Sequence, residues 1–368
     1  MPIELWTPND LMMLRRDDRM DELPSFFLDE YFPEADGFYA EDGEVRFGDL
    51  EESTRFMAPF VLPYEEGKAM QWTEAESVEA FRVPYIKLKN AVRPEDARNI
   101  KPSDIFRNGG QPPSLEERFD ARVAELDRRH RRAIRMREIW MAARAIIDAR
   151  VRIQFDRDQG AANPDVTLDF GRDPSLNVVL TDDFWSDPDA PIMTHVEQWL
   201  ARLYLIYGGG TGFRMTVGAR VAPVFKQNNQ IKQLLDVNYR GNPQDLEIGM
   251  GLTRLSRPRQ YIGRLDSGLE IWSYKDTFDI PTVGGGRQRV DILHEADIMI
   301  EAAGAGGVRA RGPIYDTKAI ASGQVAADVF AKMWETEDPG ERFIMHQASF
   351  LPVSTQPNKI LKARVLAS

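Results

Sequence analysis

The sequence has no cysteine and only four histidines among its 368 residues. The first absence excludes disulfide bridges, cysteine-ligated zinc and thiol catalysis. The histidines lie far apart in the sequence, so we expect neither a metal centre nor a cofactor. No segment reaches the roughly 18–20 apolar residues that a membrane-spanning helix needs. The first ten residues do not combine a basic region with a hydrophobic one, so we expect no secretory signal, no membrane contact and synthesis in a cytoplasm.

The composition is that of an ordinary globular protein. Hydrophobic residues make up 42% of the chain, charged residues 29% and aromatic residues 10%. These values exclude a disordered, collagen-like or coiled-coil chain. At roughly 100–200 residues per domain, the length predicts two folded units with adequate cores.

Negative charge is concentrated near the N-terminus. Residues 1–52 carry 16 acidic and four basic side chains, a net charge of −12, whereas the whole chain has a net charge of −11. Phosphate groups repel such a segment, which argues against a nucleic-acid-binding surface there. The segment is either an arm that meets a basic surface, such as one on a neighbouring copy, or a solvated acidic tail.

Residues 1–50 contain many prolines and glycines and show no sustained helical or strand period after Arg19. This pattern predicts an extended arm rather than a compact unit. The aromatic side chains of Phe26, Phe27 and Tyr31 are the candidate anchors of that arm.

Two extended patterns follow the arm, at Arg55–Leu62 and Phe81–Leu88. They predict a projecting hairpin with a long polar tip. Long loops of this kind are uncommon unless they have a function, and Lys68 and Trp72 lie near the tip.

A long helix is the clearest prediction from the sequence. Ser114 and Glu117 have the spacing of a capping box, and prolines precede them. The helix is expected to continue without glycine or proline to about Arg150, a length of about 55 Å at about 1.5 Å per residue. Such a helix is too long for one compact layer, so we expect it to lie across the molecule as a spine.

The spine helix carries six arginines within ten positions, more than one solvated face can hold. They are Arg128, Arg129, Arg131, Arg132, Arg135 and Arg137. We expect them to pair with acidic segments of the same or a neighbouring chain. Simple solvation and a DNA-facing patch are the alternatives.

The rest of the chain alternates short strands and helices. We expect strands at Val151–Phe155, Val166–Phe170, Gln260–Leu265, Leu269–Tyr274, Ile298–Ala302, Phe343–Phe350 and Ile360–Leu366, and helices at Met193–Tyr207 and Val224–Val237. A turn-rich stretch, 182–191, marks a change of domain. The last two strands return after the second domain and are expected to pair with the hairpin formed by the first two.

Three glycine-rich stretches invite comparison with phosphate-binding loops. The stretch 208–212 follows a helix and contains no lysine, so a helix stop explains it better. The stretch 303–307 follows a strand, but Pro313 would break the helix that a dinucleotide site requires, which favours a β-turn. The stretch 284–286 is expected to be a connector. No catalytic motif or constellation accompanies these turns.

The order of these parts resembles that of the major capsid proteins of tailed bacteriophages, which have the Hong Kong 97 fold, and more closely the lambda-type protein E family. The stretches that carry the resemblance are Arg129–Ala143 for the spine helix, Val166–Asp173 for the hairpin strand, Asp297–Asp316 for a strand and glycine-rich turn, and Asp338–Ser349 for the C-terminal strand.

The resemblance implies an α+β fold with five parts. These are an N-terminal arm (1–50), an extended E-loop hairpin (51–100), a peripheral domain (101–185) with the spine helix (114–150), an axial domain (186–337), and C-terminal strands (338–368) that return to the peripheral domain.

The resemblance also implies a function. The chain would be a structural major capsid (head) protein without enzymatic activity, which assembles as hexamers and pentamers into an icosahedral shell around double-stranded DNA. Its partners would be a scaffolding protein, because no scaffolding segment precedes the arm, a portal and in some shells a decoration protein. DNA contacts would be non-specific, and the protein would be assembled in the bacterial host cytoplasm and located in the virion.

The residues expected to make assembly contacts are Phe26, Phe27, Tyr31, Lys68, Trp72, Arg128, Arg132 and Arg135. Two other functions stay open. One is the shell protein of an encapsulin-like cellular nanocompartment, which would enclose an enzyme cargo. The other is a soluble nucleotide-binding enzyme built around the glycine-rich turns.

Overall fold

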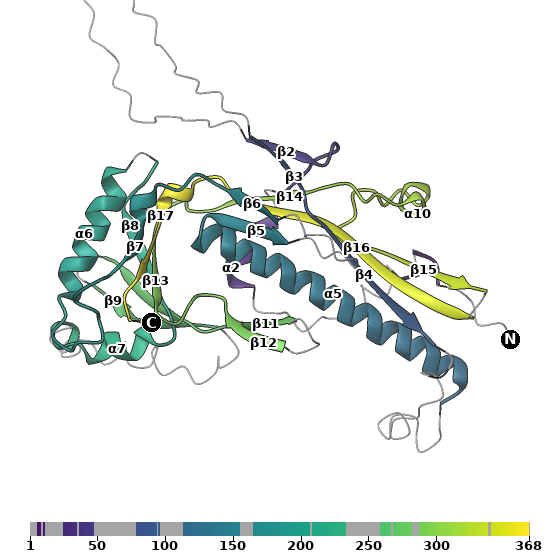
Figure 1. Ribbon diagram of the computed structural model, residues 1–368, viewed down its shortest axis with the longest axis horizontal. Helices are drawn as coiled ribbons and strands as arrows, with labels where there is room; N and C mark the ends of the chain where they lie inside the picture. The colour runs from purple at the N-terminus through teal and green to yellow at the C-terminus, as the bar shows by residue number, and fades with distance from the viewer. Residues whose placement is uncertain are drawn as a thin grey trace, which may run out of the picture.

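The computed structural model consists of two β-sheets and one long helix that runs along the first of them (Figure 1). The structure describes residues 6–8, 10–11, 25–34, 37–47, 79–93, 95, 113–154, 165–206, 208–232, 258–265, 268–281, 287–337 and 340–367. Within these residues, no helix combines the length and apolar character that a membrane span needs.

The long helix α5 spans Leu115–Ile147. The backbone N–H of Glu117 donates to the Ser114 side chain, and the backbone N–H of Ser114 donates to the Glu117 carboxylate, so both halves of the capping box form. Ala149 has a positive φ of 52°, which turns the chain out of the helix. The predicted spine helix is therefore confirmed, but it ends before Arg150.

The first sheet is built around its longest strand, β16. Its strands are β1 (Phe38–Tyr39), β4 (Tyr85–Val92), β14 (Gly307–Arg311), β15 (Phe330–Thr336) and β16 (Glu341–Ser354). β4 and β15 pair antiparallel with the first half of β16 from its two sides, β14 pairs with its second half, and β1 joins β14 in parallel. Every side chain of β16 from His346 onward is buried, as expected for a strand covered on both faces.

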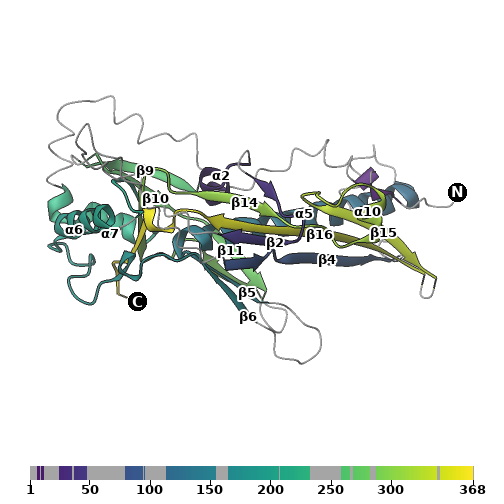
Figure 2. The same ribbon diagram turned by 90° about the horizontal axis from the view of Figure 1, so that it is seen from above.

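α5 lies along β16 (Figures 1 and 2). At about 1.5 Å per helical residue and about 3.4 Å per strand residue, both elements are roughly 50 Å long. The first half of the helix buries Phe119, Val123 and Leu126 against Ile344 of β16 and Met333 of β15. Its second half enters a separate apolar cluster that also contains residues of the second sheet.

The second sheet has the strand order β7-β17-β13-β8-β10-β9. The bounds are β7 Asn177–Val179, β8 Gly212–Val217, β9 Arg259–Arg264, β10 Glu270–Tyr274, β13 Asp297–Ala302 and β17 Ile360–Arg364. Helices α6 (Ile192–Leu205) and α7 (Val221–Gln227) pack on it through a core that includes Trp185, Trp199 and Phe225. All six residues of β13 are buried, so this strand is the centre of the sheet.

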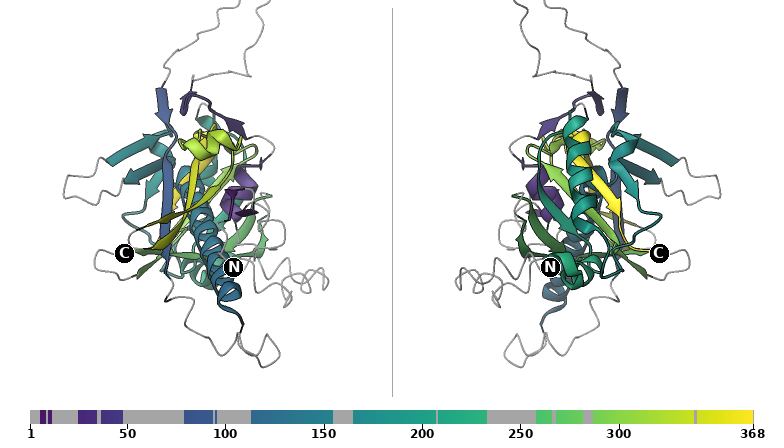
Figure 3. Two further views of the ribbon diagram at one scale, coloured as in Figure 1. Left: turned by 90° about the vertical axis from the view of Figure 1, so that its right-hand side faces the viewer. Right: turned by 90° about the vertical axis from the view of Figure 1, so that its left-hand side faces the viewer.

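Among the residues that the structure describes, the smaller elements include three two-stranded sheets, two short helices and two 3-10 turns. They are β2 (Glu44–Phe47) with β3 (Glu79–Arg82), β5 (Arg150–Gln154) with β6 (Asp165–Asp169), β11 (Thr277–Pro281) with β12 (Arg287–Asp291), α2 (Phe26–Tyr31), α10 (Thr317–Ala321), Pro174–Leu176 and Pro357–Lys359. In end-on views, α2 and the β5–β6 hairpin lie on opposite sides of the molecule (Figure 3).

The C-terminal strands correct one expectation. We expected both to pair with the hairpin at residues 151–170, and assigned residues 338–368 to the peripheral domain. Instead, β16 forms the centre of the first sheet, whereas β17 pairs with β13 and β7 in the second sheet. The reason is burial: Leu361 and Ala363 of β17 are fully buried in the core on which α6 packs, so the strand needs a partner on each side.

The segments before the spine helix differ from the prediction in two ways. α2 is helical, although no helix was expected after Arg19, because tertiary packing of its aromatic side chains stabilises a single turn and a half that local propensity would not. The expected strand Phe81–Leu88 is two strands, because Pro84 has no N–H for a ladder. The expected strand Arg55–Leu62 lies outside the described residues.

Other expectations hold with shifted boundaries. The hairpins at residues 151–170 and 260–274 and the strand at residues 298–302 are confirmed within one residue. α7 begins three residues earlier than the expected Val224 and is interrupted at Asn228; residues 229–232 are helical again, and 233–237 lie outside the described residues. The stretch 182–191 consists of turns, as predicted.

Candidate functional site at the junction of the two sheets

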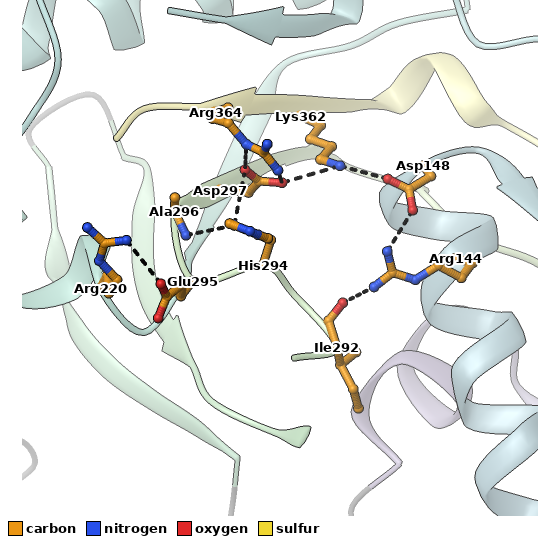
Figure 4. Close-up of polar contacts among 10 residues, drawn as sticks. All are labelled: Arg144, Asp148, Arg220, Ile292, His294, Glu295, Ala296, Asp297, Lys362 and Arg364. Atoms are coloured by element: carbon orange, nitrogen blue, oxygen red, sulfur yellow. Dashed lines mark hydrogen bonds and ion pairs between the residues drawn. The ribbon is translucent and has the colours of Figure 1, made fainter. Parts of the chain in front are cut away.

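The C-terminal end of α5 reaches the second sheet through a chain of ion pairs (Figure 4). Asp148 caps the helix and accepts from Arg144 Nη1 at 2.8 Å, one turn earlier. Its other oxygen accepts from Lys362 Nζ of β17 at 2.7 Å. Burial would raise the pKa of Asp148, but the charges of Lys362 and Arg144 outweigh burial and lower that pKa.

Lys362 carries the chain of ion pairs on to Asp297, which is fully buried at the start of β13. Lys362 Nζ lies 3.3 Å from one oxygen of Asp297, and Arg364 contacts both oxygens, at 2.7 and 3.3 Å. His294 Nδ1 is 3.8 Å away. The hydrogen bond to Asp297 raises the pKa of Arg364. A buried carboxylate is tolerated here because it has two cationic partners.

Two further contacts flank this chain of ion pairs (Figure 4). Arg144 also donates to the backbone carbonyl of Ile292, in the segment that leads into β13. Arg220, the residue just before α7, donates from Nη1 to Glu295 of the same segment at 3.0 Å. The segment before β13 is therefore held from both sides.

The short helix α2 makes a second connection between the two sheets. Asp29 Oδ1 accepts from Arg135 of α5 at 3.1 Å and from Arg309 of β14 at 3.0 Å. Arg309 is buried, and it also donates to the backbone carbonyls of Leu28 and Phe32. These bonds fasten α2 to the first sheet and to the spine helix.

The other side of α2 contacts the second sheet. Glu30 accepts from Arg214 of β8 at 3.0 Å, and Arg214 Nε lies 2.7 Å from Glu301 of β13. The hydroxyl of Tyr31 donates to the Glu301 carboxylate. Burial raises the pKa of Glu301 despite the nearby charge of Arg214, and burial together with the charge of Glu301 raises the pKa of Tyr31 well above its usual value.

Aromatic rings fill the space beside these charges. Phe27 makes an edge contact with Tyr274 of β10, with ring centroids 5.1 Å apart. The guanidinium of Arg259 lies over Phe26 at 4.6 Å and over Trp272 at 4.0 Å. Burial lowers the pKa of Arg259. The arm, β9 and β10 thus share one aromatic and cationic cluster.

This arrangement connects structural elements and shows no features of a reaction centre. Its carboxylates are paired with arginine or lysine, and no nucleophile stands beside a base. In the part of the chain that the structure describes, no group of three or more acidic or histidine side chains could hold a metal ion. The chemistry that the junction supports is the fixing of one sheet relative to the other.

Comparison with known proteins identifies the family. The family model for phage major capsid protein E matches residues 13–365. The chain belongs to the phage major capsid protein E family. No functionally curated protein matches the sequence.

Solved structures show the fold. A candidate capsid protein of a prophage from Escherichia coli CFT073 superposes with a TM-score of 0.65 at 16% identity, covering 99% of this chain and 100% of that chain. A phage-related protein from Bordetella bronchiseptica RB50 has a TM-score of 0.48 at 11% identity, covering 98% of both chains. The SrpI encapsulin of Synechococcus elongatus PCC 7942 has a TM-score of 0.42 at 8% identity, covering 97% of this chain and 95% of that chain.

The first of these likenesses, together with the family, confirms the expected α+β fold of the Hong Kong 97 type. The protein is a structural capsid subunit that forms the homo-oligomeric shell of a phage virion.

The structure places the predicted assembly residues in different settings. Phe26, Phe27 and Tyr31 pack within their own subunit, on α5 and the second sheet. Arg135 contacts the acidic arm of the same chain through Asp29. Their part in contacts between copies stays a prediction.

The remaining predicted residues lie elsewhere. Arg128 and Arg132 are exposed on α5. Lys68 and Trp72 lie outside the described residues.

The glycine-rich turn at residues 303–307 has a packing explanation. It forms the predicted β-turn, in which the N–H of Ala305 donates to the carbonyl of Ala302. A Cβ at Gly306 would lie 2.9 Å from the carbonyl oxygen of Tyr31, and one at Gly307 would lie 2.6 Å from the ring of Phe32. The turn therefore consists of glycine where α2 docks against it.

Sequence reasoning missed the acidic members of the junction. Asp297 and Glu301 stand inside a strand that is otherwise apolar, a pattern that signals buried, paired carboxylates. Lys362 and Arg364, two positions apart in β17, share one face of the strand and supply the partners for Asp297. Only the pairing of β17 with β13 brings these two signals together.

Replacing Lys362 tests the ionic connection. We expect Lys362→Met to lower the free energy of unfolding by about 1–3 kcal/mol, because Asp148 and buried Asp297 both lose a partner. Urea unfolding of the full chain measures this, and Lys226→Met, an exposed lysine on α7, is the matched control.

The same variant has a pH signature. Because the folded-state pKa of Asp148 lies below the ordinary 3.8, its contribution is present above pH 3.8 and is lost as the pH falls through the lower value. The difference between wild type and Lys362→Met should therefore shrink in acid. Equal stability of the two proteins at pH 7 would contradict the role of Lys362.

Replacing Asp29 tests the attachment of α2. Asp29→Asn removes the charge that faces Arg135 and Arg309, so the backbone amides of residues 26–31 should exchange about fivefold faster, corresponding to about 1 kcal/mol. Hydrogen exchange with mass spectrometry measures this. Glu34→Gln, an exposed carboxylate just beyond α2, should leave the exchange rates unchanged. Unchanged protection in Asp29→Asn would show that the aromatic contacts alone hold the helix.

Proposed function

We propose that this capsid subunit builds the icosahedral, DNA-containing head of a tailed bacteriophage through non-covalent contacts, together with a separate scaffolding protein and a portal. The observation that carries the proposal is the family match over residues 13–365, nearly the whole chain. Assembly would take place in the host cytoplasm, in hexamers and pentamers, and a decoration protein is a further partner in some shells.

The proposed contacts with neighbouring copies come from the spine helix and from the segment 51–100. Arg128 and Arg132 on α5 would meet the acidic arm of a neighbour, and Lys68 and Trp72 would contact the adjacent subunit from the segment 51–100. Exposed apolar side chains support a role for two places on the molecule, the far left at α6 and the upper right at α10 (Figure 1). Leu205, at the end of α6, is 79% exposed, and Ile320 in α10 is 66% exposed. Large exposed apolar side chains are typical of surfaces that another protein covers.

Non-specific contact with DNA and the absence of enzymatic activity complete the proposal. With a net charge of −11, the chain has no overall attraction for phosphate, so packaged DNA would not be held by strong electrostatic contacts. At the glycine-rich turn before β14, packing against α2 accounts for the glycines without a nucleotide.

Negative-stain imaging tests assembly directly. The full chain is purified alone and together with the product of the gene upstream, and we expect shells, tubes or rings of five or six subunits in at least one preparation. Small, monodisperse particles in both would overturn the proposal. A rise in melting temperature with added ATP or NAD would favour the nucleotide-binding alternative instead.

Charge reversal on the spine helix tests the proposed contacts between copies. Arg132→Glu should lower the yield of closed shells severalfold. The glutamate at this exposed position would repel an acidic arm, whereas the arginine attracts it. The matched control is Lys226→Glu on α7, which makes the same change of charge away from the spine helix. Particles are counted after gradient sedimentation, with circular dichroism to verify folding. Normal shell yield from a folded Arg132→Glu protein would remove this residue from the proposed interface.

A further inference from the structure

Two buried histidines meet where the spine helix crosses the first sheet. His130 of α5 and His346 of β16 face each other through their Nδ1 atoms at 2.9 Å. His346 Nε2 lies 2.7 Å from Asp127 Oδ1, and His130 Nε2 lies 2.7 Å from Asn90 Oδ1 on β4. One continuous set of hydrogen bonds therefore joins the helix to two strands of the sheet.

The positions of the protons follow from the partners. Burial opposes ionisation of Asp127, but the hydrogen bonds from His346 and Arg131 outweigh burial and lower its pKa, so Asp127 is a carboxylate that only accepts. His346 must then carry its proton on Nε2 and leave Nδ1 as an acceptor. His130 must in turn donate from its own Nδ1. The structure places Asn90 Oδ1 towards His130 Nε2, which suits a protonated Nε2; in the neutral pair, the amide turns its NH2 group towards that nitrogen instead.

The arrangement has room for one extra proton. If a proton binds His130 Nε2, the Asn90 amide turns its oxygen towards it, and every hydrogen bond remains. A second proton has only the Nδ1 of His346 to bind. Two N–H groups would then point at each other, and two cationic rings would share one buried site, so the contact between α5 and β16 would break.

The surroundings make this contact part of a larger connection. The charged groups that act on the rings are Asp127 and Arg131, both on α5. Arg131 Nε donates to Asp127 at 2.8 Å, and its Nη2 donates to the backbone carbonyl of Leu11 in the arm at 3.2 Å. β15 places Ala331 opposite His346. Each of the four charged or titratable side chains is at most 6% exposed.

We propose that His130 and His346 form a proton-operated fastening between the spine helix and the central strand. It holds while the two rings are neutral or share one extra proton, and it opens when they take up a second extra proton. Acid would then loosen the arm, the spine helix and β4 together. This inference does not depend on how copies assemble, and its test uses the full chain before assembly.

The sign of the pH effect follows from the two imidazoles. Burial lowers the pKa of His130 to about 4, and the charge of His346 adds to this; burial also lowers the pKa of His346. A histidine with a depressed pKa stabilises the fold above its unfolded pKa of 6.5, and this contribution falls as the pH drops below 6.5. The pKa of His130 is 6.5 in the unfolded chain and about 4 in the folded protein. This difference means that protonation of His130 can lower the folding equilibrium constant by at most about 300-fold. The stabilising contribution of the Asp127 carboxylate is lost only below its ordinary pKa of 3.8, which is more acidic than the range in which the histidines titrate.

A double variant tests the fastening. Wild-type protein and His130→Gln/His346→Gln are unfolded in urea at half-unit steps from pH 7.5 to 4.5. We expect the wild-type folding constant to fall at least 30-fold more than that of the double variant over this range, because all other titrating groups are common to both proteins. His294→Gln, which replaces an exposed histidine outside the pair, should keep the wild-type pH slope. A double variant that folds and keeps the wild-type slope would overturn the proposal.

A second measurement needs no variant. Wild-type protein labelled with nitrogen-15 in histidine reports the ring nitrogens by NMR. At pH 7.5, two rings should be neutral with opposite tautomers, one protonated at Nδ1 and one at Nε2, and they should titrate in two separate steps below the ordinary 6.5. Four histidines that all titrate independently near pH 6.5, or a pair with identical tautomers, would overturn the proposal.

Discussion

The packing of α5 along β16 is the contact on which the rest of this capsid subunit depends. A helix of 33 residues has a face that must be covered, and a strand buried on both sides must have a cover of equal length. The helix covers the strand and the strand covers one face of the helix, since both are about 50 Å long. The apolar contacts are non-directional, so they would allow the helix to slide. The polar contacts of Asp127, His130 and His346 are directional, and they set one register between helix and strand.

The second sheet is attached at one end of this helix through an apolar cluster and a chain of ion pairs. Ile292, Leu293 and Met299 contribute to the same apolar cluster as the end of α5. Lys362 then joins Asp148 of the helix to Asp297 of the sheet. Buried ion pairs contribute little net stability, because desolvation offsets much of their attraction. Their geometric demands are strict, so they fix how the second sheet lies against the helix.

The N-terminal arm is in part a component of its own subunit. α2 buries Phe27 and Tyr31, pairs Asp29 with both α5 and β14, and reaches Glu301 of the second sheet. The glycines at residues 306 and 307 leave the space that this docking requires. A segment with no local helical signal is thus held as a helix by partners 100 to 280 residues away in the chain. Such contacts fix the middle of the arm within its own subunit.

Local patterns in the sequence were sufficient to predict the spine helix with its cap at Ser114, the hairpins at residues 151–170 and 260–274, the glycine turn at residues 303–307, and, through the order of these parts, the capsid family. These features depend on hydrogen bonds and side-chain periods that span a few residues, so neighbouring positions reveal them. The course of β17, the helical state of α2, the partners of Asp297 and the pairing of His130 with His346 were decided only in the tertiary structure. Each of these joins positions far apart in the chain, and the energy that selects it comes from burial and from charges brought together by the fold. A polar residue in an apolar strand, such as Asp297 or His346, indicates that it needs a partner. Which residue is that partner is determined only by how the strands and the helix pack.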